Sequence, residues 1–219
     1  MIEKHQPWER PASGPAEWHV EGDDATLAAA VREHPGARVG FLPDPTSDLA
    51  RAIGLAGAGG DGLELAMDAL RITADERELF AVNMVVVGTP PDRTNWFTRT
   101  HELRVSVDGR VAHEGRATGV VVASGQYLRG NDVIPRGHPG DGRAEIQVHA
   151  VARGQRAGVR DRLPQGVHVP HPDITQTAGR RVEVVAEARP APLEVDGVSA
   201  PAATRVTIEV VPEAYLIVI

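Results

Sequence analysis

Cysteine does not occur in the 219-residue sequence, which excludes a disulfide framework and a zinc site built on thiolates. The sequence also has no run of 18 apolar residues and no positively flanked signal segment, so we predict no transmembrane segment. Basic residues number 23 against 30 acidic ones, and a formal net charge of -7 argues against a broad surface for nucleic acid. We therefore expect a cytoplasmic protein that binds no nucleic acid.

Hydrophobic residues make up 42% of the chain, which is enough for a substantial core. Residues 1–17 hold three prolines and no periodic pattern, so we predict an extended N-terminal arm there. The composition changes again near Leu70. We predict a small α/β domain over residues 18–70 and a larger all-β sandwich over residues 71–219, which makes the fold class α+β.

The small domain is expected to contain two strand–turn–helix units. Trp18 to Glu21 has the pattern of a strand, and Leu27 to His34 that of a helix that a Pro-Gly pair ends. The second unit has a strand at Arg38 to Leu42 and a helix that Asp48 would cap. Because a helix N-terminus offers free N–H groups and a positive dipole end, both units present a place for a phosphate group.

Leu63 to Leu70 is predicted as a short amphipathic helix, and from Arg71 onward short β-branched runs alternate with turn residues. Many short strands at turn spacing are typical of a sandwich or a distorted barrel. The predicted strands include Phe80–Val87, Leu103–Val107, Ala117–Ala123, Ala144–Ala150, Arg181–Glu187 and Thr204–Val211.

Four glycine-rich or acidic motifs follow one another along the chain. They are GDDAT at Gly22 to Thr26, VGFLPDPTSDLARAIGL at Val39 to Leu55, SGQYLRGNDVIPRGHPGDG at Ser124 to Gly142, and DGV at Asp196 to Val198. In this order they resemble the GGDGT loop, the PLGTGNDFA segment, the glycine-rich loop with its DDG element and the late DGE of bacterial diacylglycerol kinases. That family comprises lipid kinases that are distant relatives of NAD kinases.

The resemblance implies transfer of phosphate from ATP to a lipid hydroxyl, with ATP and Mg²⁺ bound in a cleft between the two domains. It also implies that Asp196 takes the proton from the lipid hydroxyl and that Asp141 lies near a structural Mg²⁺. An alternative reading of Asp196 is a plain Asp-Gly hairpin turn. By the same resemblance, the residues near the nucleotide are Gly22, Asp24, Thr26, Thr46 and Asp48.

The sequence departs from the family pattern where ATP would bind. Asp23 replaces the second glycine of GGDGT, and two like charges about 4 Å apart repel by about 4 kcal/mol at an effective dielectric near 20. Ala25 replaces the third glycine, at the fourth position of the motif, which costs about 1–2 kcal/mol if the loop needs a positive φ there. Asp44 adds a further negative charge, and Val198 stands where the late glutamate would support the base. These changes favour weak or lost kinase activity.

Two alternatives stay open beside the kinase. One is a non-catalytic protein that uses the interdomain cleft to bind a lipid-like or phosphorylated small molecule. The other is a subunit of a split kinase, because the leading strands and helices of the family have no counterpart in this sequence. An exposed edge of a parallel sheet would then favour a separate partner subunit or a homo-oligomer.

Two features of the larger domain have open interpretations. Trp96 and Phe97, near Arg93 and Arg99, indicate either an exposed loop that contacts lipid or a partner, or a hydrophobic plug between the sheets. Arginines concentrate over residues 143–162, where they would form either a local basic face or a solvated loop. An exposed aromatic loop and a local basic face would both be compatible with peripheral contact with a membrane.

Overall fold

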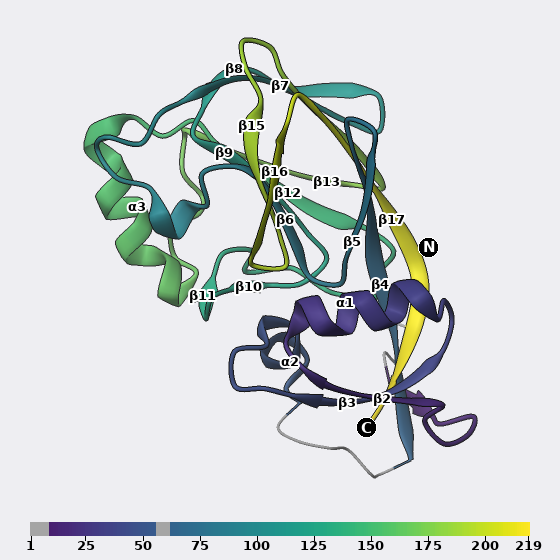
Figure 1. Cartoon of the computed structure of the whole chain (residues 1–219). Helices are drawn as coiled ribbons and strands as arrows, with labels where there is room; N and C mark the ends of the chain where they lie inside the picture. The colour runs from purple at the N-terminus through teal and green to yellow at the C-terminus, as the bar shows by residue number, and fades with distance from the viewer. Residues whose placement is uncertain (1–8, 56–61) are drawn as a thin grey trace, which may run out of the picture.

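The computed structural model of the chain describes residues 9–55 and 62–219. A large β-sandwich lies above a small α/β part that carries α1 and α2 (Figure 1). Two long strands, β4 (Leu63–Ala74) and β17 (Arg205–Val218), run through both parts and pair with each other. The predicted fold class, a small α/β part followed by a larger all-β sandwich, is confirmed.

The larger sheet has nine strands, and its main path runs β1-β4-β17-β14-β7-β8. In the small part, β2 and β3 extend this sheet as parallel strands, with β3 paired to the end of β17. The remaining members are β1 (Glu9–Pro11), β2 (Trp18–Gly22), β3 (Arg38–Pro43), β5 (Arg77–Ala81), β7 (His101–Val107), β8 (Arg110–Ala117) and β14 (Arg181–Ala186).

The second sheet has six antiparallel strands in the order β13-β12-β9-β6-β15-β16. Its β6 and β9 are runs of valine that are buried along their whole length. One face of this second sheet packs on the larger sheet, and the segment around Val133 and Ile134 covers the other face. Because both faces are buried, neither strand alternates between apolar and polar residues. The strands are β6 (Met84–Gly88), β9 (Gly119–Ala123), β12 (Ala144–His149), β13 (Ile174–Gly179), β15 (Ala191–Val195) and β16 (Val198–Ala203).

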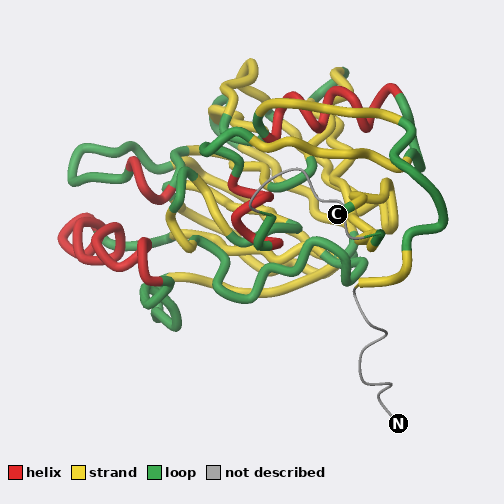
Figure 2. The backbone as a smooth tube through the Cα atoms, turned by 90° about the horizontal axis from the view of Figure 1, so that it is seen from below, coloured by secondary structure: helices red, strands yellow, loops and turns green. Residues whose placement is uncertain are grey.

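Short elements connect these layers. In Figure 2 the helix α3 lies at one end of the molecule, away from α1. In the described part of the chain, no helix is long and apolar enough to cross a membrane. The elements are α1 (Asp24–Glu33), α2 (Asp48–Ile53), η1 (Pro91–Arg93), β10 (Tyr127–Leu128), β11 (Asn131–Asp132), η2 (Arg153–Gln155), α3 (Arg156–Arg162) and η3 (Leu163–Gln165).

A separate core holds the small part together. Leucine and alanine side chains on one side of α1 and α2 pack on the sheet formed by β2, β3 and the lower ends of β4 and β17. The buried aromatic residues Phe41 and Tyr215 fill the space between them. The larger members of this core are Leu27, Val31, Phe41, Leu49, Leu65, Met67, Tyr215 and Ile217.

Three local predictions were wrong. Leu63 to Leu70 is part of the strand β4 because its backbone pairs with β17, and this pairing overrides the local amphipathic pattern. Phe80 to Val87 is divided between β5 and β6, since the backbone at residues 82–83 turns toward Asp196. The cap of α2 is Ser47, and Asp48 is the first residue of the helix.

The division into domains stays a prediction. The proposed boundary after Leu70 falls inside β4, which belongs to both parts of the molecule. In the predicted arm, residues 1–8 lie outside the described residues, and Glu9–Pro11 forms β1 against β4. The strand β1 is therefore a short strand at the edge of the larger sheet.

Candidate functional site

The N-terminus of α1 is capped by a carboxylate of the chain itself. The strand β2 ends at Gly22, whose φ of +141° suits glycine, and Asp23 follows as the N-cap. The Asp23 Oδ1 atom accepts hydrogen bonds from the Thr26 backbone N–H at 2.9 Å and from the Thr26 hydroxyl at 2.7 Å. These bonds from Thr26 hold the pKa of Asp23 below its usual value. Ala25 is helical, so the predicted penalty for a positive φ does not arise.

The N-terminus of α2 is served by a second carboxylate. Asp24 is buried at the start of α1, and its Oδ1 accepts from the Ser47 hydroxyl at 2.6 Å. Its Oδ2 accepts from the Leu49 backbone N–H at 3.0 Å, in the first turn of α2. Burial raises the pKa of Asp24 to about 6, although the bonds from Ser47 and Leu49 oppose the rise. Asp24 thus joins the two helix N-termini.

Asp48 fixes the turn between β10 and β11 to the start of α2. Its Oδ1 accepts from the Gly130 backbone N–H at 2.8 Å, and its Oδ2 accepts from the Arg129 backbone N–H. Thr46, on the exposed turn before α2, donates its backbone N–H to Asp44 Oδ1 at 2.7 Å. Both predicted nucleotide residues of this segment are therefore engaged within the chain.

Arg129 links this turn to the sandwich. Its Nε and Nη2 donate to the two carboxylate oxygens of Asp92, each at 2.8 Å, and its Nη1 donates to Glu194. Although burial opposes the charge, the bonds to Asp92 and Glu194 hold the pKa of the guanidinium above its usual value. Arg129 adopts a φ of +50°, an uncommon conformation for a residue with a side chain. It therefore ties α2, η1 and β15 together.

Asp196 lies in the turn between β15 and β16 and points its carboxylate inward. The two oxygens accept the backbone N–H groups of Val82 at 2.8 Å, Asn83 at 3.0 Å and Met84 at 2.8 Å. Burial, and next the charge of Asp24, raise the pKa of Asp196 to about 8. The Asn83 side chain donates to Asp24 Oδ2 at 3.1 Å, so Asn83 joins the two aspartates, through its side-chain amide to Asp24 and its backbone N–H to Asp196.

Asp141 lies apart from these groups. It is exposed, and its Oδ1 accepts from the Arg143 backbone N–H at 3.0 Å within its own turn. The buried carboxylate nearby is Asp68, which accepts from Gly142 at 2.6 Å and from Glu213 at 3.0 Å. Over residues 9–55 and 62–219 no three histidine, aspartate or glutamate side chains are grouped so that they could hold a metal ion.

A cavity of about 410 Å³ lies between α1 and the hairpin of β15 and β16, at the junction of the two parts. Asp196 contributes to its wall, and Arg32 and Glu33 are the charged residues of α1 that line it. The rest of the lining is mainly small or apolar, and it comes from Ala25, Ala28, Ala29, Leu79, Phe80, Val195, Val198, Ser199, Ala200 and Pro201. This cavity suits a ligand with an apolar part.

The structure brings most of the predicted site residues together. Asp24, Asp48 and Asp196 belong to one polar network at the junction, and Gly22 and Thr26 adjoin it at the start of α1. Arg129, in the glycine-rich loop of the third motif, also belongs to the network, and the sequence did not single out two further members, Asn83 and Glu194. The available signal was a polar residue within an apolar run, as in Val82-Asn83-Met84.

Two solved structures of similar fold carry the names of kinases. A diacylglycerol kinase from Bacillus anthracis str. Sterne superposes with a TM-score of 0.71 at 18% sequence identity, over 92% of this chain and 75% of that one. Yeast NADH kinase complexed with NADH superposes with a TM-score of 0.54 at 11% identity, over 91% of this chain and 60% of that one. Among curated protein sequences, none matches the chain.

The chain therefore shares its fold with a diacylglycerol kinase and with an NADH kinase. The sequence model of one family, described as the YegS C-terminal NAD kinase beta sandwich-like domain, matches residues 94–219, which is more than half of the chain. The chain belongs to this family. The predicted resemblance to bacterial lipid kinases is confirmed at the level of the family.

Proposed function

We propose that the protein is a diacylglycerol kinase-like protein whose ATP-dependent phosphoryl transfer is weak or lost, and that it binds a lipid-like ligand in the cavity between α1 and the β15–β16 hairpin. One observation carries the proposal. Carboxylates of the chain itself, from Asp23 and Asp24, accept the N–H groups at the N-termini of both α1 and α2. These are the donors that a nucleotide phosphate would use.

The residues at the two helix ends do not fit a triphosphate. A phosphate group at α1 would compete with the Asp23 carboxylate for the Thr26 N–H, and one at α2 would compete with Asp24 for the Leu49 N–H. Each approach would also bring like charges together, at about 4 kcal/mol per pair of unit charges 4 Å apart at an effective dielectric near 20. Both effects would weaken the binding of ATP.

The candidate base is also poorly suited to catalysis near neutral pH. Phosphoryl transfer relies on positioning, a metal and a base in line with the transferred group. The pKa of Asp196 near 8 keeps the carboxyl largely protonated at pH 7, and its oxygens already accept three backbone N–H groups. Val198, at the position of the family's supporting glutamate, is exposed and cannot share a proton. These features support a binding role.

The cavity supports a ligand with an acyl or similar apolar group. Its volume of about 410 Å³ lies within the range typical of small-molecule sites. One solved protein of similar fold is a diacylglycerol kinase, and this name makes a glyceride the first ligand class to test. Within this proposal Asp196 and Ser199 are the polar groups on the β15–β16 side of the cavity that a hydroxyl of the ligand would meet.

Titration calorimetry with ATP and Mg²⁺ tests the proposal. We expect no binding by the native protein at millimolar nucleotide, and a gain in affinity of at least about tenfold for Asp23→Asn, which keeps the helix cap but removes the charge. Asp161→Asn makes the same change in net charge on the exposed face of α3 and should have no effect. The proposal would be wrong if the native protein bound ATP at micromolar concentration and phosphorylated diacylglycerol in an Asp196-dependent manner.

A further inference from the structure

The loop between η1 and β7 exposes two aromatic side chains to solvent. Trp96 is 58% exposed and Phe97 is 88% exposed, and Phe97 has the highest exposure of any large hydrophobic residue in the described ranges. The reading of this pair as a hydrophobic plug between the sheets is therefore wrong. Two adjacent exposed aromatic residues are a common sign of a contact with a partner or a lipid surface.

The protein holds this loop in a defined shape. The buried Arg156 of α3 donates from Nη1 to the carbonyl oxygens of Asn95 at 3.2 Å and Thr98 at 2.7 Å. Arg160, one turn further along α3, donates to the Thr94 carbonyl at 3.2 Å. Within the loop, the Asn95 backbone N–H donates to the Thr98 hydroxyl at 2.8 Å. The aromatic pair is thus presented on a preorganised loop, which lowers the entropy lost on binding.

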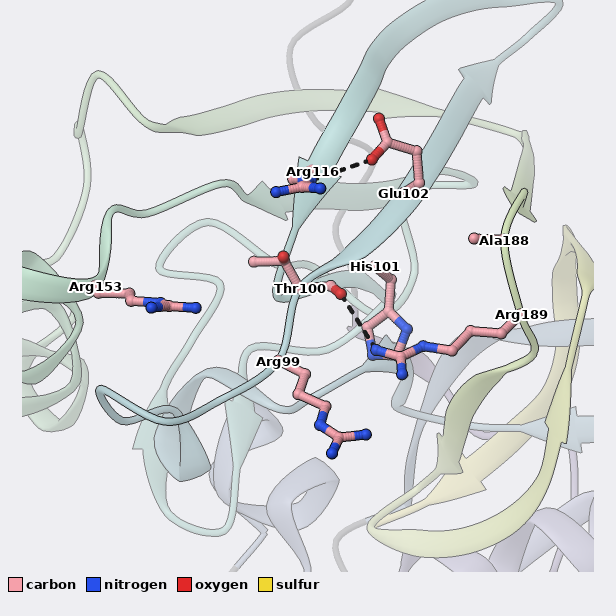
Figure 3. Close-up of a pocket in the computed structure, with 8 residues that line it drawn as sticks. All are labelled: Arg99, Thr100, His101, Glu102, Arg116, Arg153, Ala188 and Arg189. Atoms are coloured by element: carbon pink, nitrogen blue, oxygen red, sulfur yellow. Dashed lines mark hydrogen bonds and ion pairs between the residues drawn. The ribbon is translucent and has the colours of Figure 1, made fainter.

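A pocket of about 420 Å³ beside this loop is lined by four arginines. In Figure 3, Arg153 and Arg189 extend toward each other from opposite sides of it. The four come from separate segments: the loop before β7, the end of β8, η2 and the loop after β14. They are Arg99, Arg116, Arg153 and Arg189.

The pocket carries an excess of positive charge in a protein whose net charge is -7. Glu102 forms an ion pair with Arg116 at 3.4 Å, but the other three guanidinium groups make no ion pair with any residue that the structure describes. The His101 side chain is buried in the pocket wall, and burial followed by the charge of Arg189 lowers its pKa. An anion would relieve this repulsion.

The aromatic loop and the pocket form one continuous surface. Arg99 is two residues after Phe97. Gly154 lies against the Trp96 ring, since a Cβ on this glycine would be 3.8 Å from Trp96 Cζ3, and its neighbour Arg153 lines the pocket. We call this surface the aromatic–arginine face, and it consists of Trp96, Phe97, Arg99, Arg116, Arg153 and Arg189.

We propose that the aromatic–arginine face docks on an anionic phospholipid bilayer, with Trp96 and Phe97 in the interfacial layer and a headgroup phosphate in the arginine pocket. Tryptophan favours the membrane interface, and a guanidinium group matches the two oxygens of a phosphate. The combination of exposed aromatic rings with uncompensated positive charge matches an anionic bilayer in both respects. The face shares no residue with the cavity at the junction, so the proposal goes beyond the proposed function and does not depend on it.

Vesicle flotation with the full chain tests the face. We expect the protein to partition at least about tenfold more strongly onto phosphatidylcholine vesicles containing a third of phosphatidylglycerol than onto pure phosphatidylcholine. The double variant Arg99→Gln, Arg153→Gln should lower the partition coefficient about 30-fold. Trp96→Ala with Phe97→Ala should lower it at least about tenfold. Raising the salt from about 0.1 M to about 0.5 M should weaken binding of the native protein.

A matched control removes the same charge from the turn of the β7–β8 hairpin and from the neighbouring turn between β13 and β14. Arg110→Gln with Arg180→Gln loses two exposed arginines and should bind vesicles within about twofold of the native protein. Equal loss in both double variants, or no preference for anionic vesicles, would overturn the proposal. The proposal would also be wrong if soluble phosphate bound the protein as tightly as the vesicles do. A Phe97-dependent dimer, found together with no vesicle binding, would assign the face to protein–protein contact instead.

Discussion

Replacing Arg129 with methionine is expected to lower the free energy of unfolding by about 2–4 kcal/mol. The guanidinium pairs with Asp92 and Glu194, whose side chains are only 14% and 6% exposed. Without the Arg129 side chain, the Asp92 carboxylate loses both of its hydrogen bonds, and the Glu194 carboxylate keeps only its bond from Arg93. An unpaired buried charge is costly, and the shorter, apolar side chain of methionine cannot replace the lost bonds. Urea denaturation followed by circular dichroism measures the change.

The matched control is Arg136→Met, which removes an exposed arginine from the segment between β11 and β12. We expect it to change the stability by less than about 0.5 kcal/mol, as is usual for an exposed residue. A second test combines Arg129→Met with Glu194→Gln, and the two effects should fall short of their sum because the second change removes the charge that the first leaves unpaired. Equal effects of Arg129→Met and Arg136→Met would show that the network contributes nothing to stability.

The elements that local signals define were predictable from the sequence. The helix predicted over Leu27 to His34 is present as α1, which begins three residues earlier, at Asp24, because Asp23 caps its N-terminus. The Asp-Gly pairs at residues 108–109 and 196–197 form hairpin turns with positive φ at both positions. By contrast, the local pattern of Leu63 to Leu70 is compatible with a helix as well as with a strand. The strand is decided by pairing with β17, which lies near the other end of the sequence.

The site was predictable only in part for the same reason. The family motifs led to Asp24, Asp48 and Asp196, because each lies within a short local pattern. Their actual partners come from distant segments: Arg129 reaches Glu194 across 65 positions, and Asn83 reaches Asp24 across 59. No local pattern contains such a pair, so the network that joins the helix ends to the sandwich required the fold itself.

Replacing Asp196 with alanine is expected to destabilise the protein by about 3 kcal/mol or more, because three backbone N–H groups lose their acceptor at once. The Asp-Gly turn at residues 108–109 provides a matched control. Asp108 also has a positive φ, and it accepts the backbone N–H groups of Arg180 and Arg181, but it is exposed to solvent. Asp108→Ala should therefore have a smaller effect, about 1 kcal/mol. Equal effects would mean that the burial of Asp196 adds nothing.

The pH dependence separates the charge of Asp196 from its hydrogen bonds. Its folded pKa of about 8 lies above the usual 3.8, so the folded state holds a proton that the unfolded chain has released. The stability that this proton contributes is complete below about pH 4 and is lost as the pH rises through 8, at up to about 1.4 kcal/mol per pH unit.

Asp196→Asn cannot titrate, so its unfolding free energy should fall less steeply than that of the native protein between pH 5 and 8. Asp24, with a pKa of about 6, titrates in both proteins and cancels in the difference. Parallel pH profiles for the two proteins would show that Asp196 is ionised throughout this range, and it would then be available as a base at neutral pH.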